Sequence, residues 1–188
     1  PEYGTNEEFK AVLDGAHQRG LRVIMDLVIN HTSDQHEWFK KSCAGDPKYK
    51  DYYIWRPGRG KDGKKFPNNW MATFPGDGWK WNEERGEYYL HLFAVEQPDL
   101  NHDNPAVREE VKKIMRYWLD MGVDGFREDV ITYISKKEGL PNGFPLPAAR
   151  GMEHYSPGPN LKKYLQEYRE VVKEYVDRLQ LGEAPMMT

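Results

Sequence analysis

Two carboxylates at the ends of short apolar segments are the residues of this sequence best suited to catalysis. Asp129 stands two residues after Arg127, and Glu183 follows Gly182 much further along the chain. Cleavage of a glycosidic bond uses such a pair, because one carboxylate attacks the anomeric carbon while the other protonates the leaving oxygen, at a separation of about 5 Å when configuration is retained. A structural ion pair between Arg127 and Asp129 is the alternative explanation.

The alternation of side chains along a strand decides which neighbours of Asp129 can act with it. Arg127 and Asp129 share one face of a strand, whereas Glu128 points to the other face. A guanidinium beside a carboxylate keeps the carboxylate ionised. This arrangement favours Asp129 as a nucleophile.

A third group of polar residues gathers where another apolar segment ends. Asp26 lies within that segment, and Asn30 and His31 follow it. An imidazole at the tip of a strand can donate a hydrogen bond to a sugar hydroxyl, although a lone histidine is more often structural. A metal site is the competing use, but no second His or Cys stands at ligand spacing, so we predict neither a metal nor another cofactor.

Aromatic residues are frequent between Trp38 and Phe93. The chain has 6 Trp, 12 Tyr and 7 Phe, and in this stretch many of them stand among Gly, Pro and Asn. Flat side chains of this kind can stack on sugar rings. An ordinary aromatic core beneath a long loop explains the same composition and is the commoner case.

Length and charge limit the class of protein. The 188 residues are 38% hydrophobic with a formal charge of −3 from well-mixed acids and bases, which is typical of one globular domain and leaves no footprint for nucleic acid or an anionic membrane. No apolar run reaches the length of a membrane span. The single cysteine, Cys43, cannot form an internal disulfide, so we expect a cytoplasmic protein. Both ends of the chain look cut, and nothing indicates an oligomeric state.

The elements before the first polar cluster have clear signals. Thr5 and Glu8 have capping-box spacing and apolar residues follow at helical spacing, which predicts a helix that ends by Gly20. Residues 21–29 are nearly continuously apolar and β-branched, the pattern of a strand buried on both faces.

The next stretch, residues 34–103, has little periodicity and many turn residues. It contains one good strand candidate, at 87–93, and it is too long for a simple loop, so we predict a small inserted domain. Helical order returns with Asn104 as a cap and Pro105 at the first helical position, and it ends near Gly122.

Three further elements complete the pattern. We predict a strand over 123–130, a helix whose apolar face extends from Leu161 to Leu179, and a strand that ends at Glu183. Alternation of helix and strand implies parallel strands with right-handed crossovers. An open doubly wound sheet fits, but polar residues at the carboxyl end of each strand favour an α/β fold that is part of a (β/α)8 TIM barrel. A whole barrel takes about 250 residues, so the chain would supply only some of its strands.

Four short strings carry a family resemblance. They are Asp26-Leu27-Val28-Ile29-Asn30-His31, Gln97-Pro98-Asp99-Leu100-Asn101, Gly125-Phe126-Arg127-Glu128-Asp129 and Gly182-Glu183. In this order they resemble signature regions of glycoside hydrolase family 13, the α-amylase family. The resemblance spans essentially the whole chain. It implies the third to fifth strands of the barrel, with residues 1–33 and 104–188 in a partial catalytic barrel and residues 34–103 as the inserted domain B.

Within that family, residues 97–101 and 130–136 are similar to oligo-1,6-glucosidases and related exo-acting α-glucosidases. The resemblance implies a retaining hydrolase of α-glucosidic bonds in short oligosaccharides such as isomaltose, with Asp129 as nucleophile and Glu183 as acid/base. It also implies a set of substrate-binding residues: His31, Arg127, Phe74, Phe93 and Gln97. Val130, beside the nucleophile, is similar to members that cleave α-1,6 bonds rather than α-1,4 bonds alone.

The sequence departs from the family pattern in two ways. The position of Glu128 is usually apolar, and a carboxylate that faces the helix layer is costly unless it is paired or protonated. The family's further catalytic Asp, its His neighbour and a sugar-binding Asp lie on strands outside this chain. We therefore expect the isolated chain to be inactive.

Other functions share these features. Trehalose-6-phosphate hydrolase, sucrose isomerase and trehalose synthase belong to the same family and carry the same motifs. A non-catalytic relative, such as the heavy chain of certain amino-acid transporters, would lack the catalytic residues that are retained here. A sugar-binding module without chemistry would explain the aromatic residues but not the carboxylate pair.

Overall fold

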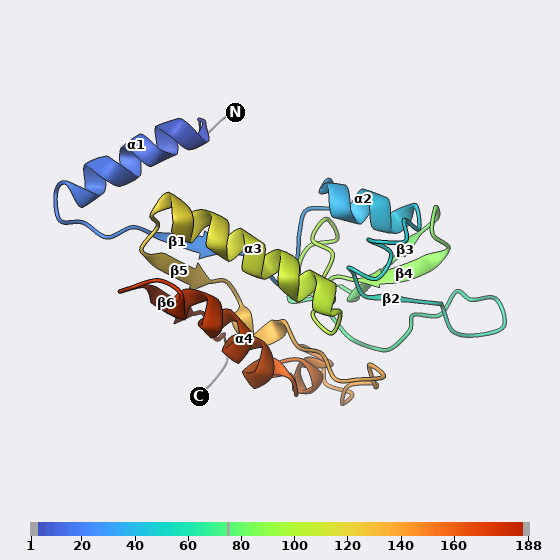
Figure 1. The fold of residues 1–188 in the computed structure, drawn as a ribbon. Coiled ribbons are helices and arrows are strands. Elements are labelled where there is room, and N and C mark those ends of the chain that lie inside the picture. The colour runs from blue at the N-terminus through green and yellow to red at the C-terminus, as the bar shows by residue number, and fades with distance from the viewer. Residues whose placement is uncertain (1–3, 75, 186–188) are drawn as a thin grey trace.

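Two separate sheets organise the computed structural model, which describes residues 4–74 and 76–185 (Figure 1). One sheet is parallel, in the order β1 (Ile24–Leu27), β5 (Gly125–Glu128) and β6 (Leu179–Gly182). The other is antiparallel, in the order β2 (Trp55–Arg56), β4 (Glu87–Leu90) and β3 (Trp79–Asn82). The helices of the described residues are α1 (Asn6–His17), α2 (Glu37–Cys43), α3 (Pro105–Met121) and α4 (Leu161–Lys173), with short 3-10 helices η1 (Ile131–Tyr133) and η2 (Met152–His154).

The predicted helix boundaries have local causes. The Thr5 hydroxyl accepts the N–H of Glu8 at 3.2 Å, and the Thr5 N–H donates to the Glu8 carboxylate at 2.7 Å, so the capping box begins α1 as expected. Asn104 caps α3 and Pro105 is its first residue. Gly122 ends α3 with a φ of 110°, a left-handed conformation that glycine adopts without steric cost.

The parallel sheet follows from the alternation of helix and strand. Asp26 lies opposite Arg127 in the β1–β5 pair, and Glu128 lies opposite Gly182 in the β5–β6 pair. Helices α3 and α4 lie against this sheet (Figure 1), and apolar residues of both helices, of β1 and of β5 form one buried core: Leu27, Phe126, Val111, Met115, Leu119, Tyr164, Tyr168, Val171 and Val172. The three carboxyl ends therefore meet at one edge of the sheet.

Most aromatic residues of the inserted stretch are core residues rather than exposed stacking surfaces. Phe39 packs against Tyr53, Trp55 and Tyr89 at ring separations of 5.0 to 5.6 Å. This cluster and a second one around Trp70 hold the antiparallel sheet and α2 together. The structure confirms a strand within 87–93, and it adds β2, which is too short to give a periodic signal, and β3, which has the same length as β4.

Two predicted elements differ from the structure. The first strand is Ile24–Leu27, and the prediction that it is buried on both faces is wrong, since Ile24 is 40% exposed. Within the described residues β1 pairs with β5 alone, which leaves its other edge open. The apolar face predicted as far as Leu179 is also wrong at its end, because α4 ends at Lys173 and Val176 is 87% exposed. Asp177 adopts a φ of 57°, which a right-handed helix cannot contain.

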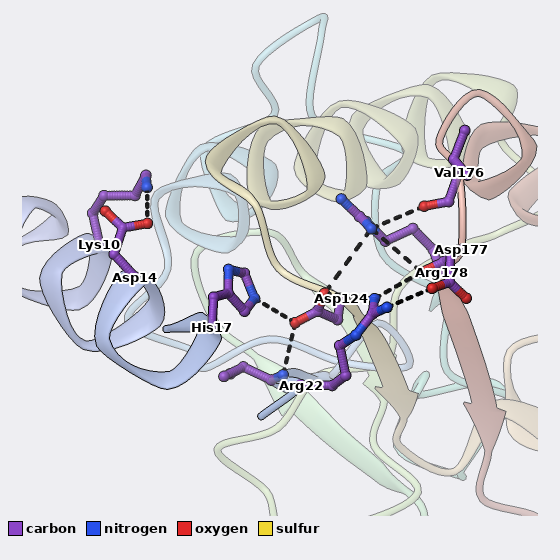
Figure 2. A network of polar contacts seen from close by, with 9 residues as sticks. Lys10, Asp14, His17, Arg22, Asp124, Val176, Asp177 and Arg178 are labelled. Carbon is purple, nitrogen blue, oxygen red and sulfur yellow. Dashed lines mark hydrogen bonds and ion pairs between the residues drawn. The ribbon is translucent and has the colours of Figure 1, made fainter. Parts of the chain in front are cut away.

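A polar network around Asp124 joins the amino-terminal ends of the strands, as Figure 2 shows. The buried carboxylate of Asp124 lies 2.7 Å from His17 Nε2, accepts the N–H of Val23 at 2.8 Å, and accepts from Arg22 Nη1 at 3.2 Å. Burial acts to raise the pKa of Asp124, but the hydrogen bonds from Val23, His17 and Arg22 outweigh it, and the pKa is lowered. Arg22 also pairs with the exposed Asp177 at 2.5 Å.

Asp124→Asn should lower the free energy of unfolding at pH 7 by about 1–3 kcal/mol, because charge-assisted hydrogen bonds to a buried group are lost. A carboxylate with a lowered folded-state pKa stabilises above its unfolded-state pKa of about 3.9, and this contribution is lost as pH falls through the folded-state value. Urea unfolding at pH 7 and pH 3 measures both effects. Asp177→Asn is the control, and an equal loss in both variants would contradict a special role for Asp124.

Candidate active site

Three carboxylates surround one guanidinium at the carboxyl ends of the parallel strands. Arg127 Nη1 donates to Asp26 Oδ1 at 2.7 Å and to Asp129 Oδ1 at 2.6 Å. Its other terminal nitrogen, Nη2, lies 2.7 Å from Glu183 Oε2. The hydrogen bond to Asp26, followed by that to Asp129, raises the pKa of Arg127, so the guanidinium is charged. One cation therefore binds both predicted catalytic carboxylates.

Strand register places these side chains. Asp26 is the Cα partner of Arg127, and Asp129 follows on the same face, as the alternation predicts. Glu183 is positioned through its backbone, because its N–H donates to Glu128 O at 2.9 Å and its carbonyl accepts the N–H of Ile131 at 3.1 Å. The crossover connections of a parallel sheet thus bring residues of distant sequence to one guanidinium.

The arrangement can support acid–base and nucleophilic chemistry on one substrate. The side chain of Asp129 is 21% exposed and that of Glu183 is 42% exposed, so both carboxylates are accessible from solvent. Arg127 holds Asp129 by a hydrogen bond, and a carboxylate positioned in this way can act as a nucleophile. A carboxyl group beside it supplies the proton donor that glycosidic cleavage needs.

His31 lies in a second group, which residues of the inserted stretch build. Its buried ring is 5.1 Å from the ring of Phe93, and Phe93 is 6.3 Å from Phe74, which is 55% exposed. Burial lowers the pKa of His31, although the negative charges of Asp99 and Asp129 act to raise it. The structure therefore places His31, Phe93 and Phe74 together. The negative charge of Asp129 acts on His31.

Gln97 contacts the imidazole ring of His31, which was predicted to bind sugar. Its Nε2 lies 3.0 Å from His31 Nε2, and its Oε1 accepts the N–H of Ala94 at 3.0 Å, which orients the amide. In this conformation Gln97 is the donor and His31 the acceptor. The contact with Gln97 therefore occupies Nε2 of His31 in this conformation.

One cavity among the described residues does not coincide with the carboxylates. It has a volume of about 540 Å³, and its lining includes His31, Gln97, and Val111 and Ile114 of α3. Asp129 and Glu183 do not line it. The cavity therefore shares His31 and Gln97 with the candidate site but does not contain its carboxylates.

Sequence reasoning overlooked three contributors to this region. Asp26 was placed on its strand but not in the site, although its register opposite Arg127 follows from a parallel pairing of the two strands. Lys136 and Asp99 form a buried ion pair at 2.7 Å, and Lys136 Nζ donates to Asn30 Oδ1 at 2.9 Å. Both lie in strings that show the family resemblance, but only the folded chain shows that they meet.

Glu128 points away from the carboxylate cluster, as predicted, and is buried against the helix side of the sheet. Gln180 Nε2 donates to its Oε1 at 2.9 Å, so this carboxyl group has a hydrogen-bond partner. Burial raises the pKa of Glu128, and the bond from Gln180 only partly opposes this. The departure from an apolar residue is therefore accommodated in part by the hydrogen bond from Gln180.

Glu128→Gln should raise the free energy of unfolding at pH 7 by about 1 kcal/mol, because the amide keeps an oxygen for Gln180 and carries no buried charge. The raised folded-state pKa means that Glu128 stabilises most below the unfolded-state pKa of about 4.3 and less as pH rises through the folded-state value. Thermal unfolding between pH 4 and pH 8 should therefore show a flatter pH dependence in the variant. The exposed Glu138→Gln is the control, and the same change in both variants would refute this explanation.

Two features are absent from the described residues, a metal-binding group and a membrane-spanning helix. No group of three or more His, Cys, Asp and Glu in residues 4–74 and 76–185 is arranged to hold a metal ion. None of the helices in this part of the chain is both long and apolar enough to cross a membrane.

Fold and site together define a segment of a (β/α)8-barrel enzyme that carries carboxylates at the strand ends. A family model described as "Alpha amylase, catalytic domain" matches residues 1–188. The chain belongs to this family, glycoside hydrolase family 13, and the barrel rather than the open sheet is the correct fold.

Curated relatives cover the whole chain. It is 51% identical to an oligo-1,6-glucosidase of Parageobacillus thermoglucosidasius and 49% identical to one of Bacillus cereus, over 100% of this chain and 34% of each relative. It is 42% identical to a trehalose-6-phosphate hydrolase of Bacillus subtilis, over 100% of the chain and 33% of the relative. The chain thus spans about a third of the length of these relatives.

Solved structures give the same result. The trehalose-6-phosphate hydrolase of Bacillus licheniformis superimposes with a TM-score of 0.92 at 42% identity, over 100% of this chain and 33% of that one. Trehalulose synthase of Pseudomonas mesoacidophila superimposes with a TM-score of 0.86 at 44% identity, over 96% of this chain and 32% of that one. A hydrolase and a synthase therefore share this part of the fold.

Proposed function

We propose that this chain is the central part of the catalytic domain of a retaining α-glucosidase that cleaves α-1,6 bonds, and also α-1,4 bonds, of short oligosaccharides such as isomaltose. The observation that carries the proposal is the single guanidinium of Arg127 that contacts both Asp129 and Glu183. The oligo-1,6-glucosidases named above, at 49% and 51% identity, support the choice of substrate.

In this mechanism the two carboxyl groups act in turn. Glu183 gives its proton to the glycosidic oxygen as the bond to the anomeric carbon breaks, and Asp129 attacks that carbon to form a glucosyl ester. Glu183 then takes a proton from water, which opens the ester and restores both carboxyl groups with net retention. Arg127 remains charged throughout and orients both groups.

The glucosyl unit would be bound by residues of both parts of the chain. Arg127 belongs to the barrel portion, 1–33 and 104–188, as does His31. Phe74, Phe93 and Gln97 come from residues 34–103, which we propose as domain B. The contacts of Phe93 and Gln97 with His31, and of Phe74 with Phe93, support a pocket formed where the two portions meet.

A trehalose-6-phosphate hydrolase is the second candidate, because a structure of that name superimposes with a TM-score of 0.92. An isomerase is the third, through the similarity to trehalulose synthase. The identity to both is lower than to the oligo-1,6-glucosidases, which favours the first proposal.

A substrate panel separates these candidates. Isomaltose, maltose, trehalose 6-phosphate and sucrose are supplied to a full-length protein that contains this chain, with the 188-residue chain assayed beside it. We expect glucose from isomaltose, released first as the α-anomer in an NMR time course, and no turnover by the isolated chain. Release from trehalose 6-phosphate alone, or conversion of sucrose to an isomer, would replace the first proposal by the second or third.

We also propose that the full-length protein is cytoplasmic and acts on a free small oligosaccharide. Cys43 is the only cysteine and is buried, so the chain needs no oxidising compartment for its fold. Fractionation of cells, followed by assay of isomaltose hydrolysis, tests this location. Activity in the culture medium would contradict it.

A further inference from the structure

Val130, the residue after the proposed nucleophile, has a strained backbone. Its φ of 38° and ψ of 41° lie in the left-handed region, where β-branched residues are rare outliers. Three other non-glycine residues among those described have positive φ, namely Leu140, Ala149 and Asp177, and none of them is β-branched. Strain of this kind concentrates at functional sites, where surrounding structure holds it in place.

The left-handed turn directs the N–H of Val130 at the proposed acid/base. This N–H donates to Glu183 Oε2 at 3.1 Å, and Arg127 Nη2 lies 2.7 Å from the same oxygen. Among the described residues, no hydrogen bond is directed at Oε1. The two oxygens of the Glu183 carboxyl group therefore have different environments.

This difference decides where a proton can reside. An oxygen that accepts from an N–H and faces a guanidinium at hydrogen-bond distance has no room for a proton of its own. The other oxygen, Oε1, is left to carry it. The main chain of Glu183 is held by hydrogen bonds with Glu128 and Ile131, so the contacts of Val130 and Arg127 act on a side chain that starts from a fixed backbone.

We propose that Val130 is a positioning residue for the acid/base, whose N–H holds Oε2 of Glu183 so that Oε1 carries the proton to the leaving oxygen. The inference rests on the proposed role of Glu183. In the first step the proton passes from Oε1 to the glycosidic oxygen as the bond to the anomeric carbon breaks. In the second, water returns a proton to the same oxygen.

Packing is the competing explanation for the strain. Val130 is 7% exposed and belongs to a buried cluster with Tyr133 and Leu140, and on this explanation the turn serves only the packing of that cluster. The positioning role requires the N–H of Val130, whereas the packing explanation requires its isopropyl side chain. They can be separated by removing one and keeping the other.

The first variant replaces Val130 with its α-hydroxy acid in the full-length protein, which turns the amide into an ester and deletes only the N–H. We expect kcat/KM for isomaltose to fall by about 10- to 100-fold, because a misplaced acid protonates a poor leaving group slowly. For 4-nitrophenyl α-glucoside, whose leaving group needs little protonation, we expect a fall of less than about threefold. The same ester at the exposed Val176 is the control and should change neither value.

The second variant, Val130→Gly, keeps the N–H and removes the side chain. Glycine adopts the left-handed conformation without strain. Because the Val130 side chain resembles that of members that cleave α-1,6 bonds, its removal can change linkage selectivity, so the ester and the glycine variant are both also assayed on phenyl α-glucoside, which has no second sugar and whose leaving group needs the acid more than 4-nitrophenolate does. In the glycine variant the ratio of kcat/KM for phenyl to 4-nitrophenyl α-glucoside should stay within about threefold of the unsubstituted value, whereas in the ester this ratio should fall. A ratio that changes as in the ester, or an ester with equal losses on both substrates, would overturn the proposal. The glycine variant alone decides against it if its ratio changes, even where the ester does not fold.

Glu183→Gln separates failure of this inference from failure of the proposed function. It should lose much more activity on isomaltose than on 4-nitrophenyl α-glucoside, because only the former requires the acid. If Glu183→Gln lacks this pattern, the acid/base assignment is wrong. If it shows the pattern and the Val130 ester does not, the assignment stands and the positioning role of Val130 is wrong.

Discussion

Asp129→Asn in a full-length protein that contains this chain should lower kcat on isomaltose by about 10⁴-fold or more, because removal of a covalent nucleophile eliminates the pathway rather than slowing one step. The substituted amide still accepts a hydrogen bond from Arg127, so substrate binding and folding should change little. Steady-state kinetics and a thermal unfolding curve measure both. The exposed Asp120→Asn on α3 is the matched control and should leave kcat unchanged.

A smaller variant at the same position tests the role more directly. Asp129→Gly leaves space for azide, which should attack the anomeric carbon of 4-nitrophenyl α-glucoside from the opposite face and give the β-glucosyl azide. Formation of that product would show that Asp129 occupies the position of the attacking group. Unchanged turnover in Asp129→Asn would exclude Asp129 as the nucleophile and with it the retaining mechanism proposed here.

The carboxylate cluster was predictable because simple geometry governs it. Side chains two residues apart share a strand face, so Arg127 and Asp129 had to meet. Parallel strands joined by crossovers align their carboxyl ends, so Glu183 had to approach the same edge. The capping box at Thr5 and the cap at Asn104 are local signals of the same reliability.

Features that depend on distant contacts were not predictable in the same way. Apolar residues continue at helical spacing after Lys173, although α4 ends there. The left-handed backbone of Asp177 shows that the following residues are not helical. Strands β2 and β3 are held by their pairing with β4 and not by a pattern of their own. The left-handed backbone of Val130 has no sequence signal at all, since β-branched residues avoid it.

The ion pair of Lys136 and Asp99 is another contact that the sequence did not predict, and it is deeply buried. Their side chains are 2% and 0% exposed, and the two residues come from the loop after β5 and from the end of the inserted stretch. Asn30, at the tip of β1, contacts both, with its Nδ2 at 3.1 Å from Asp99 and its Oδ1 at 2.9 Å from Lys136. Three segments therefore depend on one charge pair next to His31.

Lys136→Met should lower the free energy of unfolding by about 3–5 kcal/mol, because it leaves the Asp99 carboxylate buried without its cation. The exposed neighbour Lys137→Met is the control and should change it by less than about 0.5 kcal/mol. A double variant with Asp99→Leu removes the stranded charge and should recover part of the loss, as expected for a buried pair whose desolvation offsets its attraction.

Activity shows whether the pair also orients the site. Loss of the Lys136 contact frees Asn30, whose backbone carbonyl accepts the N–H of Leu100 at 2.9 Å and whose neighbour is His31. At a temperature where Lys136→Met is still folded, we expect a higher KM for isomaltose with a smaller change in kcat, because His31 would bind the sugar and not the reacting atoms. Equal stability and KM in the Lys136 and Lys137 variants would contradict this, and the pair would then join the segments without acting on the sugar.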